Sequence, residues 1–342
     1  MSNPGPIVIH GAGSIGCYIG GWLAAAGAPV IYLGRSGIRE EIAAHGMLLT
    51  GQEGRQCGFQ PREVDYRTDP QVLSEARLIL VAVKSLGTQA AAEEIRRHAR
   101  QDALVVSLQN GLRNATALRA ALRDKRVLAG MVPFNVVHRG PGHWHCGTSG
   151  NLQIEASPLL ADYLPWFAQA GLPVTESADI AATQWGKLLL NLNNPINALS
   201  GLPLREQLAQ AAYRRCLAFC VEEALHCLNG AGIRPRAVGP VPPEEMVRLL
   251  RLPDDEYQLV VGARQKIDAA ARSSMWEDLE HGRPTEVDYL NGEVVALAKA
   301  LGQSAPCNAM ALALVHAAEH GGRRDWGGGE LLQQLVSGMT DS

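Results

Sequence analysis

One lysine and two asparagines recur at helical spacing in a leucine-rich stretch of the chain. Lys187, Asn191 and Asn194 stand at positions i, i+4 and i+7. This spacing places them on one face of a helix that we predict over residues 183–199. Polar groups on an otherwise apolar face are costly unless they find partners or line a wet cleft. In a cleft, an ammonium can stabilise and protonate an oxygen that gains negative charge, whereas a solvated stripe would do no chemistry.

Two later polar stretches hold the other candidate groups, Ser274 in SSMWED and Glu286 in GRPTEVDYLNG. Thr285 with Asp288 three residues on is a variant of the capping box, so we predict a helix over residues 286–301 with Glu286 in its first turn. A carboxylate at that position either complements the helix dipole, worth about 0.3–1 kcal/mol when exposed, or belongs to a site.

The stretch IVIHGAGSIG near the N-terminus predicts a buried strand, a glycine turn and then a helix. In dinucleotide-binding turns, the first glycine allows the bend, the second admits a pyrophosphate and the third lets helix and strand pack closely. Gly11, Gly13 and Gly16 occupy these three places. The N–H groups at the helix start, including those of Ser14 and Ile15, would face the pyrophosphate. The alternative is a glycine-rich turn that holds nothing.

The end of the next predicted strand, PVIYL, indicates which dinucleotide would bind. An NAD site places an acidic residue there to bind the ribose 2′-hydroxyl. Here Arg35 and Ser36 follow the strand, and a guanidinium suits a 2′-phosphate. We therefore predict NADPH as the cofactor, the alternative being a solvated surface arginine.

Lys84 and Asn110 each follow a further apolar stretch that predicts a central parallel strand. Ligands of doubly wound sheets bind at the carboxyl ends of the strands, so both residues are candidate cofactor contacts. Lys84 could instead snorkel at a sheet edge, and Asn110 with the following glycine could be a simple turn.

Composition limits the function classes. The chain has 342 residues, 46% hydrophobic and 19% charged, with a formal net charge of −3. This length favours two domains, and the charge balance argues against nucleic acid as a partner. Neither a signal sequence nor a membrane span is recognisable, which predicts a cytoplasmic protein. Helical domains often supply dimer surfaces, so a homodimer stays open.

Cysteine and histidine patterns do not indicate a metal or a disulfide framework. The seven cysteines contain no C-x-x-C pair. Cys216, Cys220 and Cys227 follow a helical pattern in which thiols act as small hydrophobes. The stretch HWHC at residues 143–146 resembles part of a metal site, but no further ligands complete the set, and we predict a hairpin without metal.

Strand and helix signals alternate in the first half of the chain, which predicts an α/β domain with a doubly wound sheet over residues 1–177. Short strands over residues 127–155 predict an antiparallel extension of that sheet. Residues 178–342 lack strand signals and predict an all-helical domain, with the tail after His320 partly ordered or frayed. Its predicted helices cover residues 183–199, 206–229, 254–279, 286–301 and 309–319.

With these motifs the chain resembles the ketopantoate reductase (2-dehydropantoate 2-reductase) family. The resemblance covers nearly the whole length, through GxGxxG, VKS, QNG, WxKxxxN, SSMxxD and RxTExDYxNG. It implies a Rossmann-type domain, a helical domain and NADPH in the cleft between them. The implied reaction is hydride transfer to a 2-oxo acid that yields a 2-hydroxy acid, most directly 2-dehydropantoate to pantoate for pantothenate biosynthesis.

The resemblance also implies a role for each candidate residue. Lys187 resembles the catalytic lysine, here the general acid, and Glu286 the active-site glutamate. Asn191 and Ser274 correspond to substrate contacts, Lys84 and Asn110 to cofactor contacts, and Arg35 to the 2′-phosphate contact. Asn194, which shares the helix face of Lys187 but stands one residue before the family's position, is a further candidate substrate contact.

Three positions depart from the family's pattern, because Pro195, Leu204 and Ala271 stand where amides are usual. Each lost amide removes a donor and an acceptor, so a bulkier or more apolar ketone, or an imine, is an alternative to ketopantoate. A different class is a non-catalytic NADPH-binding sensor or scaffold. The presence of both Lys187 and Glu286 argues against that class, since a sensor needs no proton donor.

Overall fold

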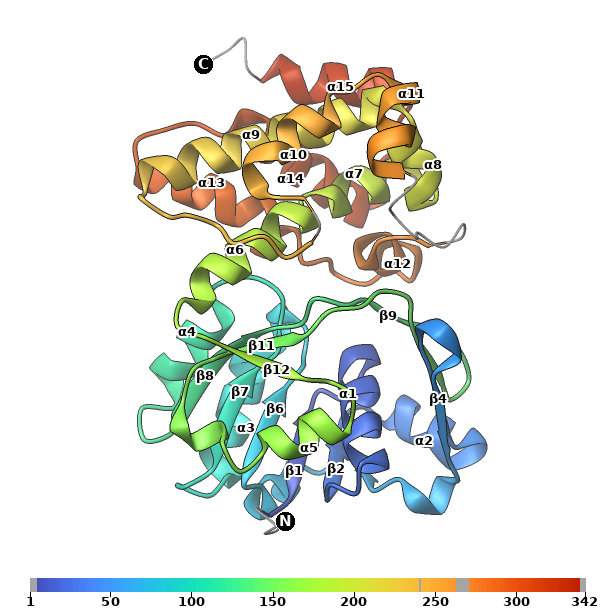
Figure 1. Cartoon of the computed structure of the whole chain (residues 1–342), viewed down its shortest axis with the longest axis vertical. Coiled ribbons are helices and arrows are strands. Elements are labelled where there is room, and N and C mark those ends of the chain that lie inside the picture. The colour runs from blue at the N-terminus through green and yellow to red at the C-terminus, as the bar shows by residue number, and fades with distance from the viewer. Residues whose placement is uncertain (1–4, 240, 263–270, 339–342) are drawn as a thin grey trace. The chain divides into compact units, whose positions relative to one another are not determined.

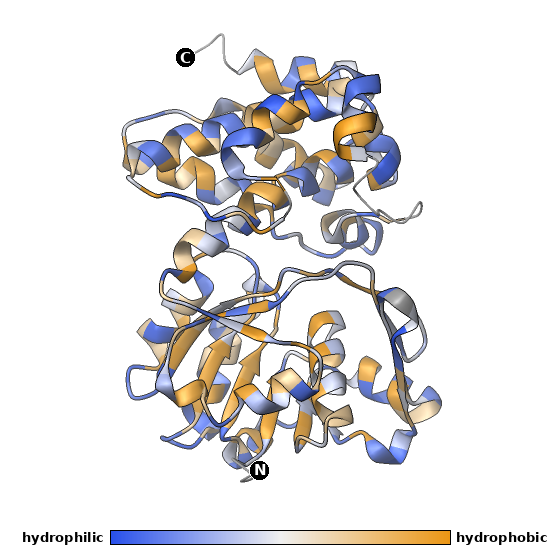
Figure 2. Cartoon of the chain, in the orientation of Figure 1, coloured by the Kyte–Doolittle hydropathy of each residue, from blue (hydrophilic) through white to orange (hydrophobic). Residues whose placement is uncertain are grey.

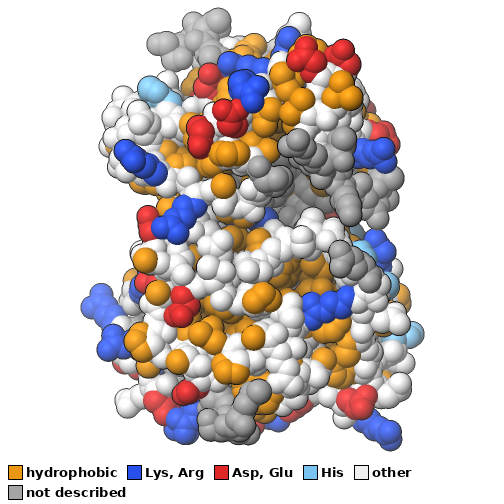
Figure 3. Space-filling model, in the orientation of Figure 1, with side chains coloured by type: hydrophobic (Ala, Val, Ile, Leu, Met, Phe, Trp, Pro, Cys, Tyr) orange, Lys and Arg blue, Asp and Glu red, His pale blue; other side chains and the backbone are white. Residues whose placement is uncertain are grey.

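The computed structural model describes residues 5–239, 241–262 and 271–338. The chain divides into two compact units, Met1–Ile180 and Ala181–Ser342 (Figure 1). Across the described residues, no helix combines the length and apolarity needed to span a bilayer. On the face drawn in Figure 3, acidic and basic side chains are interspersed rather than gathered into a field of one sign.

An eight-stranded sheet with the order β12-β11-β8-β7-β6-β1-β2-β5 forms the centre of the first unit. The neighbouring strands from β5 to β8 pair in parallel, and β11 joins β8 antiparallel. The strands are β1 (Ile7–His10), β2 (Val30–Leu33), β5 (Tyr66–Arg67), β6 (Leu78–Val81), β7 (Leu104–Ser107), β8 (Arg126–Met131), β11 (Leu152–Glu155) and β12 (Val174–Ser177).

Helices cover both faces of this sheet, because its central strands are apolar on both sides (Figure 2). Ile7 and Ile9 pack in the core that contains α1, whereas Val8 packs in the core that contains α3. This is the doubly wound, Rossmann-type arrangement predicted from the sequence. The helices are α1 (Ser14–Ala25), α2 (Ser36–His45), α3 (Thr88–His98), α4 (Asn114–Ala121) and α5 (Leu164–Gln169), with short 3₁₀ helices at Gln52–Gly54, Pro61–Glu63, Pro70–Glu75, Ser85–Gly87 and Pro158–Leu160.

A separate four-stranded sheet, with the order β4-β3-β10-β9, lies in the same unit. Its strands are β3 (Met47–Thr50), β4 (Gln56–Phe59), β9 (Val136–Gly140) and β10 (His143–Cys146). The predicted antiparallel extension is therefore right for β11 but wrong for β8, which pairs in parallel with β7, and for β9 and β10, which lie in the second sheet. Those two strands form the predicted hairpin, and β10 then pairs with β3 because its alternate residues, including the fully buried Trp144, face the core.

The described part of the second unit is helical and contains no strand. Its helices are α6 (Ile180–Asn191), α7 (Asn193–Ser200), α8 (Leu204–Ala209), α9 (Ala211–Gly230), α10 (Pro243–Leu250), α11 (Asp254–Tyr257), a π-helical turn (Gln258–Gly262), α12 (Ser274–Glu280), a 3₁₀ turn (Val287–Tyr289), α13 (Asn291–Ala300), α14 (Pro306–Glu319) and α15 (Gly328–Ser337). The tail after His320 is thus partly helical.

Three of the predicted helices are interrupted. The helix over residues 183–199 breaks at Leu192, because Pro195 has no N–H to donate to the carbonyl of Asn191. The helix over residues 206–229 breaks at Gln210, whose backbone is extended. The helix over 254–279 consists of α11, the π-helical turn and α12, and its residues 263–270 lie outside the described part of the chain.

The capping box predicted at Thr285 does not start a long helix. Thr285 Oγ1 accepts a hydrogen bond from Val287 N at 3.3 Å, but only the 3₁₀ turn Val287–Tyr289 follows. Leu290 then leaves the helical region, with φ −117° and ψ −89°, and α13 begins at the next residue. Glu286 therefore precedes a short turn and does not lie in the first turn of α13.

Candidate functional site

In the glycine turn between β1 and α1, one of the three glycines has room for a side chain and the other two do not. Gly11 has φ +95°, and a Cβ on it would lie 2.6 Å from Val83 Cγ1. A Cβ on Gly16 would lie 2.7 Å from the carbonyl oxygen of Gly11 and 2.8 Å from Ile9 Cγ2. A Cβ on Gly13 would meet no atom within 4 Å. Two glycines thus serve packing, while the third leaves its side of the backbone open to a ligand.

The start of α1 can receive an anion. Its N-cap is Gly13, which has no side chain to cap the first N–H groups, and its first turn, which includes Ser14 and Ile15, contains no acidic residue. Both features suit a negatively charged group at the positive end of the helix dipole. The turn itself is held to β2, because Gly11 N and Ala12 N both donate to the carbonyl of Leu33 at 2.9 and 3.0 Å.

Arg35 lies just beyond the end of β2, exposed, as the N-cap of α2. The first turn of α2 also lacks an acidic residue, so this end of the sheet presents a second helix start next to a guanidinium. Arg35 acts on Tyr66: burial raises the pKa of the Tyr66 hydroxyl, and the charge of Arg35 opposes that rise.

Tyr66 was not predicted as a site residue, yet it links β5 to the glycine turn. Its hydroxyl donates to the carbonyl of Ala12 at 2.9 Å, and its ring stacks on Tyr32 with 6.1 Å between centroids. A Cβ on Gly34 would collide with the Tyr66 hydroxyl. Residue 34 therefore has to be glycine, because a side chain there would displace the Tyr66 hydroxyl that bonds to the glycine turn.

Lys84 and Asn110 follow β6 and β7, as predicted, with Lys84 exposed and Asn110 half-buried. Ser85 Oγ donates to the carbonyl of Asn110 at 3.3 Å, which joins the two strand ends. The carboxyl ends of these strands thus bring the two candidate cofactor residues onto adjacent loops.

A buried polar network that sequence reasoning missed holds these loops. Asn114 Nδ2 donates to Ser85 Oγ at 3.0 Å, and Gln109 Nε2 donates to Thr88 Oγ1 at 2.7 Å. Thr88 Oγ1 lies 2.8 Å from Asn114 Oδ1. The only sequence signal for this network is a cluster of small polar residues directly after two apolar strands, a pattern that surface turns share.

His10, the last residue of β1, is a further group that the sequence did not single out. The side chain is 5% exposed, and its Nε2 lies 2.8 Å from Glu94 Oε2 on α3. Contact with His10 lowers the pKa of the Glu94 carboxyl. The pair lies on the α3 side of the sheet, one residue before the glycine turn.

Lys187 lies on α6 in the second unit, where its side chain is half-buried. Burial lowers the pKa of its ammonium to about 8. The preceding residue has to be glycine, because a Cβ on Gly186 would collide with the carbonyl oxygen of Arg236. Arg236 N also donates to the carbonyl of Ala182 at 2.9 Å, so an extended segment packs closely on α6 beside the lysine.

Asn191 ends α6, and Asn194 lies in the first turn of α7; both are half-buried. The start of α12 joins α7 through Ser273, whose hydroxyl donates to the carbonyl of Asn194 at 3.3 Å. Ser273 also caps α12, accepting from Trp276 N at 3.1 Å. These contacts bring Asn194 close to Ser274, which is exposed as the first residue of α12.

Buried amides that were not predicted fix this region. Asn197 Oδ1 accepts from Ser273 N at 2.8 Å. Asn193 and Gln207 exchange two hydrogen bonds of 3.1 Å between their side chains, which ties α7 to α8. Two of the positions that depart from the family pattern also meet, since Leu204 N donates to the carbonyl of Ala271 at 2.8 Å.

Glu286 is half-buried on the segment between α12 and α13. Its neighbour Thr285 is 3% exposed and Val287 is fully buried. An ion pair between Arg283 Nε and Asp278 Oδ1 at 3.2 Å holds the start of the segment to α12. The backbone around Glu286 is therefore anchored although it is not part of a long helix.

The HWHC stretch has a structural explanation. Thr50 Oγ1 lies 2.8 Å from His143 Nε2 and 2.8 Å from His145 Nδ1, which joins β10 to β3. Among the described residues, no three His, Cys, Asp or Glu side chains are grouped to hold a metal ion. Cys216, Cys220 and Cys227 are buried along α9, as their helical pattern predicts.

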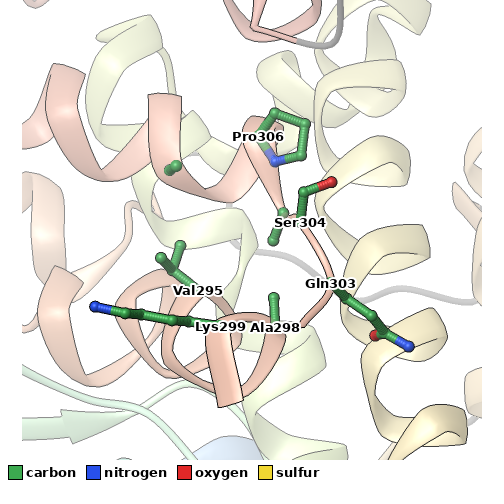
Figure 4. A pocket seen from close by; sticks show the side chains of 8 residues that line it. Val295, Ala298, Lys299, Gln303, Ser304 and Pro306 are labelled. Atoms are coloured by element: carbon green, nitrogen blue, oxygen red, sulfur yellow. The ribbon is translucent and has the colours of Figure 1, made fainter. Parts of the chain in front are cut away.

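A cavity of about 370 Å³ opens beside α13 in the second unit (Figure 4). Its lining includes Val295, Ala298, Lys299, Gln303, Ser304 and Pro306. No candidate residue lines this cavity, so it is not part of the candidate site.

Comparison with known proteins identifies the family. Residues 7–158 match the family described as ketopantoate reductase PanE/ApbA, and residues 179–319 match its C-terminal counterpart. A 2-dehydropantoate 2-reductase of Halobacterium salinarum is 29% identical over 86% of this chain and 92% of its own length. A crystal structure of a PanE/ApbA family ketopantoate reductase from Ralstonia eutropha is 32% identical, with a TM-score of 0.79 over 92% of this chain and 99% of its own.

A dimeric ketopantoate reductase from Staphylococcus aureus has the same fold at 17% identity, with a TM-score of 0.68 over 92% of this chain and 99% of its own. Both halves of the chain thus match one family of oxidoreductases in sequence and in fold. This chain belongs to the ketopantoate reductase family.

Proposed function

We propose that this protein is an NADPH-dependent reductase that converts a 2-oxo acid to a 2-hydroxy acid, with 2-dehydropantoate as the first substrate to test. The observation that carries the proposal is the half-buried Lys187 ammonium, whose pKa burial lowers to about 8. An acid with a pKa near the working pH is the most effective proton donor. Burial thus places an effective acid on an otherwise mostly apolar helix.

The first unit has the features that a dinucleotide requires. The open side of Gly13 and the free start of α1, with Ser14 and Ile15, suit a pyrophosphate. Arg35 at the end of β2, where an NAD site has a carboxylate, favours a 2′-phosphate and hence NADPH over NADH. The first unit would then be the NADP-binding domain, with Lys84 and Asn110 as further cofactor contacts.

When bound, the nicotinamide would supply the hydride, and the chain itself would supply the proton. As hydride reaches the carbonyl carbon, the carbonyl oxygen gains negative charge. The Lys187 ammonium would stabilise that charge and then protonate the oxygen, which leaves a neutral amine that regains a proton from water. Near neutral pH most of the lysine is in the protonated form that this step needs.

The remaining candidate residues would bind the substrate and orient Lys187. Asn191 follows Lys187 by one helical turn, and the amides of Asn191 and Asn194 can donate to the oxygens of a 2-oxo acid. The Ser274 hydroxyl, exposed at the start of α12, can donate to the substrate carboxylate. Glu286 would orient the ammonium or bind a substrate hydroxyl. The second unit would then be the substrate domain.

A substrate other than ketopantoate is the second candidate within this proposal. Leu204 and Ala271, which replace family amides, are joined through their backbones in one place. An apolar patch there would favour an apolar substituent on the 2-oxo acid over a hydroxylated one. A cytoplasmic role in pantothenate biosynthesis belongs to the ketopantoate alternative only. The dimeric relative supports a homodimer as the form to test.

A panel of 2-oxo acids, assayed by loss of NADPH absorbance, tests the proposal. Ketopantoate turnover supports the first substrate, and turnover of 2-oxo acids with apolar substituents supports the second. Binding of NADPH, detected by fluorescence titration, with no turnover of any carbonyl or imine would refute the reductase and support a sensor. Parallel assays with NADH test the cofactor, because equal catalytic efficiency with both cofactors would contradict the role of Arg35.

A further inference from the structure

The segment that carries Glu286 is anchored to the last turn of α14 on both sides of that residue. On the N-terminal side, the backbone N–H of Thr285 donates to Glu319 Oε1 at 2.7 Å. Because Thr285 is 3% exposed, water cannot easily replace this acceptor. The residue directly before Glu286 is thus fixed by a carboxylate from another helix.

On the C-terminal side, His316 links the same carboxylate to the 3₁₀ turn. His316 Nδ1 lies 3.0 Å from Glu319 Oε2, and His316 Nε2 lies 3.2 Å from Asp288 Oδ1. Asp288 follows Glu286 by two residues, so the two anchor points flank Glu286 closely. Tyr289 N also donates to the carbonyl of Glu286 at 2.9 Å, which closes the turn.

The two carboxylates beside His316 favour a protonated ring that bridges Glu319 and Asp288. Both ring nitrogens can donate to carboxylates only when the ring is protonated. Burial lowers the pKa of His316, but its hydrogen bonds to Glu319 and Asp288 outweigh burial and raise that pKa above its ordinary value. Burial raises the pKa of Glu319, but its bonds with Thr285 and His316 outweigh burial and lower it. Asp288 on the 3₁₀ turn and Glu319 on α14 are the charged groups that act on His316.

Glu319 stands in the last turn of α14, where a carboxylate needs hydrogen-bond donors that compensate for an unfavourable position. A carboxylate in the last turn of a helix is disfavoured by the helix dipole. The donors from Thr285 and His316 offset that cost, so the arrangement is specific to the segment that carries Glu286.

We propose that Glu319 and His316 are positioning residues, which hold the backbone on either side of Glu286 so that its carboxylate is presented in a fixed orientation. This inference rests on the proposed role of Glu286 in the reductase site. Neither Glu319 nor His316 needs to touch substrate or cofactor for it to hold.

A double-mutant cycle on the full chain tests the proposal. Glu319→Ala should lower kcat/KM about tenfold or more, because small displacements of an orienting group are costly. Its affinity for NADPH, measured by fluorescence titration, should stay unchanged. Glu319→Gln, which keeps an acceptor for the Thr285 N–H, should recover part of the loss. His320→Ala is the matched control, since His320 is exposed on the same helix end and its ring bonds to the His316 carbonyl.

The decisive comparison is made in the Glu286→Gln background. If Glu319 acts through Glu286, then Glu319→Ala should cost less than about twofold once Glu286 is already changed. An equal loss in both backgrounds would overturn the proposal, because a general structural defect acts independently of Glu286. Full activity of Glu319→Ala in the otherwise unchanged protein would overturn it as well.

Failure of the proposed function gives a different result. If Glu286→Gln keeps full turnover, the proposed role of Glu286 is refuted. Amide hydrogen exchange then tests separately whether Glu319 anchors the segment around Glu286. Faster exchange confined to residues 285–289 in Glu319→Ala would support the two anchor points without a catalytic purpose. Unchanged exchange in those residues would overturn the inference.

Discussion

Replacing Lys187 with methionine should stabilise the folded protein at neutral pH, although it removes the proposed acid. The fall of the lysine pKa from 10.5 to about 8 corresponds to about 3 kcal/mol, at 1.36 kcal/mol per pKa unit. This is an upper value, since the side chain is half-buried and solvent reduces the cost. Methionine has a similar length and carries no charge to desolvate. We therefore expect Lys187→Met to be more stable at pH 7 by up to about 3 kcal/mol.

The sign of the pH dependence distinguishes this cause from improved packing. Below pH 8 the ammonium is charged in the folded and the unfolded chain, and only the folded chain bears the desolvation cost. Between about pH 8 and 10.5 the folded chain has lost the proton that the unfolded chain retains, so wild-type stability rises through this window relative to Lys187→Met. Above that window the electrostatic advantage of the variant should have vanished.

Urea unfolding of both proteins from pH 6 to about pH 10 measures this difference directly, because effects of other titrating groups cancel between them. Lys299→Met is the control, since Lys299 is exposed on α13 and its replacement should stay within about 0.5 kcal/mol at each pH. A stability difference that is constant across the pH range, or a destabilised Lys187→Met at pH 7, would refute burial as the cause of the lowered pKa.

Three further predictions concern the proposed reaction. Lys187→Ala should lower kcat by about 10²–10⁴-fold. Wild-type turnover should fall as the pH rises above about 8, where the amine loses its proton. Steady-state rates measured across pH check both expectations, and wild-type turnover that stays level up to pH 10 would contradict the role of Lys187 as the acid. Arg35→Ala should raise the Kd for NADPH about tenfold or more while the Kd for NADH stays within about twofold, as fluorescence titration would measure. Gly13→Ala should weaken NADPH binding with stability changed by less than about 0.5 kcal/mol, whereas Gly16→Ala should cost about 1–3 kcal/mol in urea unfolding, because its Cβ meets backbone.

Local sequence patterns predicted much of the fold because they report on burial directly. The apolar runs of β1, β6 and β7 are buried on both faces, as continuous apolar strands of a parallel sheet should be. Gly11 and Gly16 have the steric roles that the motif assigns to them. Strand pairing between distant segments, in contrast, has no local pattern in the sequence that predicts it. Nothing in the sequence of β3 or β10 indicates that they pair with each other rather than with the main sheet.

Two helix boundaries that were predicted wrongly lie at prolines. Pro195 breaks the predicted helix after Asn191, because it has no N–H to donate to the Asn191 carbonyl, and this effect of proline is local to the sequence. No helix was predicted between residues 229 and 254, yet Pro243 stands at the first position of α10, where its missing N–H costs nothing. The helix predicted from Glu286 is interrupted at Leu290, whose φ of −117° and ψ of −89° lie outside the helical region.

The candidate residues that project from helices and strand ends were accessible to sequence reasoning, whereas the groups that support them were not. Tyr66, Asn114 and Asn197 fix the loops near the candidate residues through hydrogen bonds across 54, 29 and 76 positions of sequence. Side chains of this kind look like ordinary turn or helix residues until the fold brings their partners together.

The interruption at Leu192 has a consequence for the neighbouring lysine. In an uninterrupted helix the peptide oxygen of residue 191 would be consumed by the amide four positions later, but Pro195 has no hydrogen to offer it. Lys187 therefore stands about one turn before the end of a short helix and not in the middle of a long one, and Asn191 and Asn194 belong to two different helices, each with its own axis.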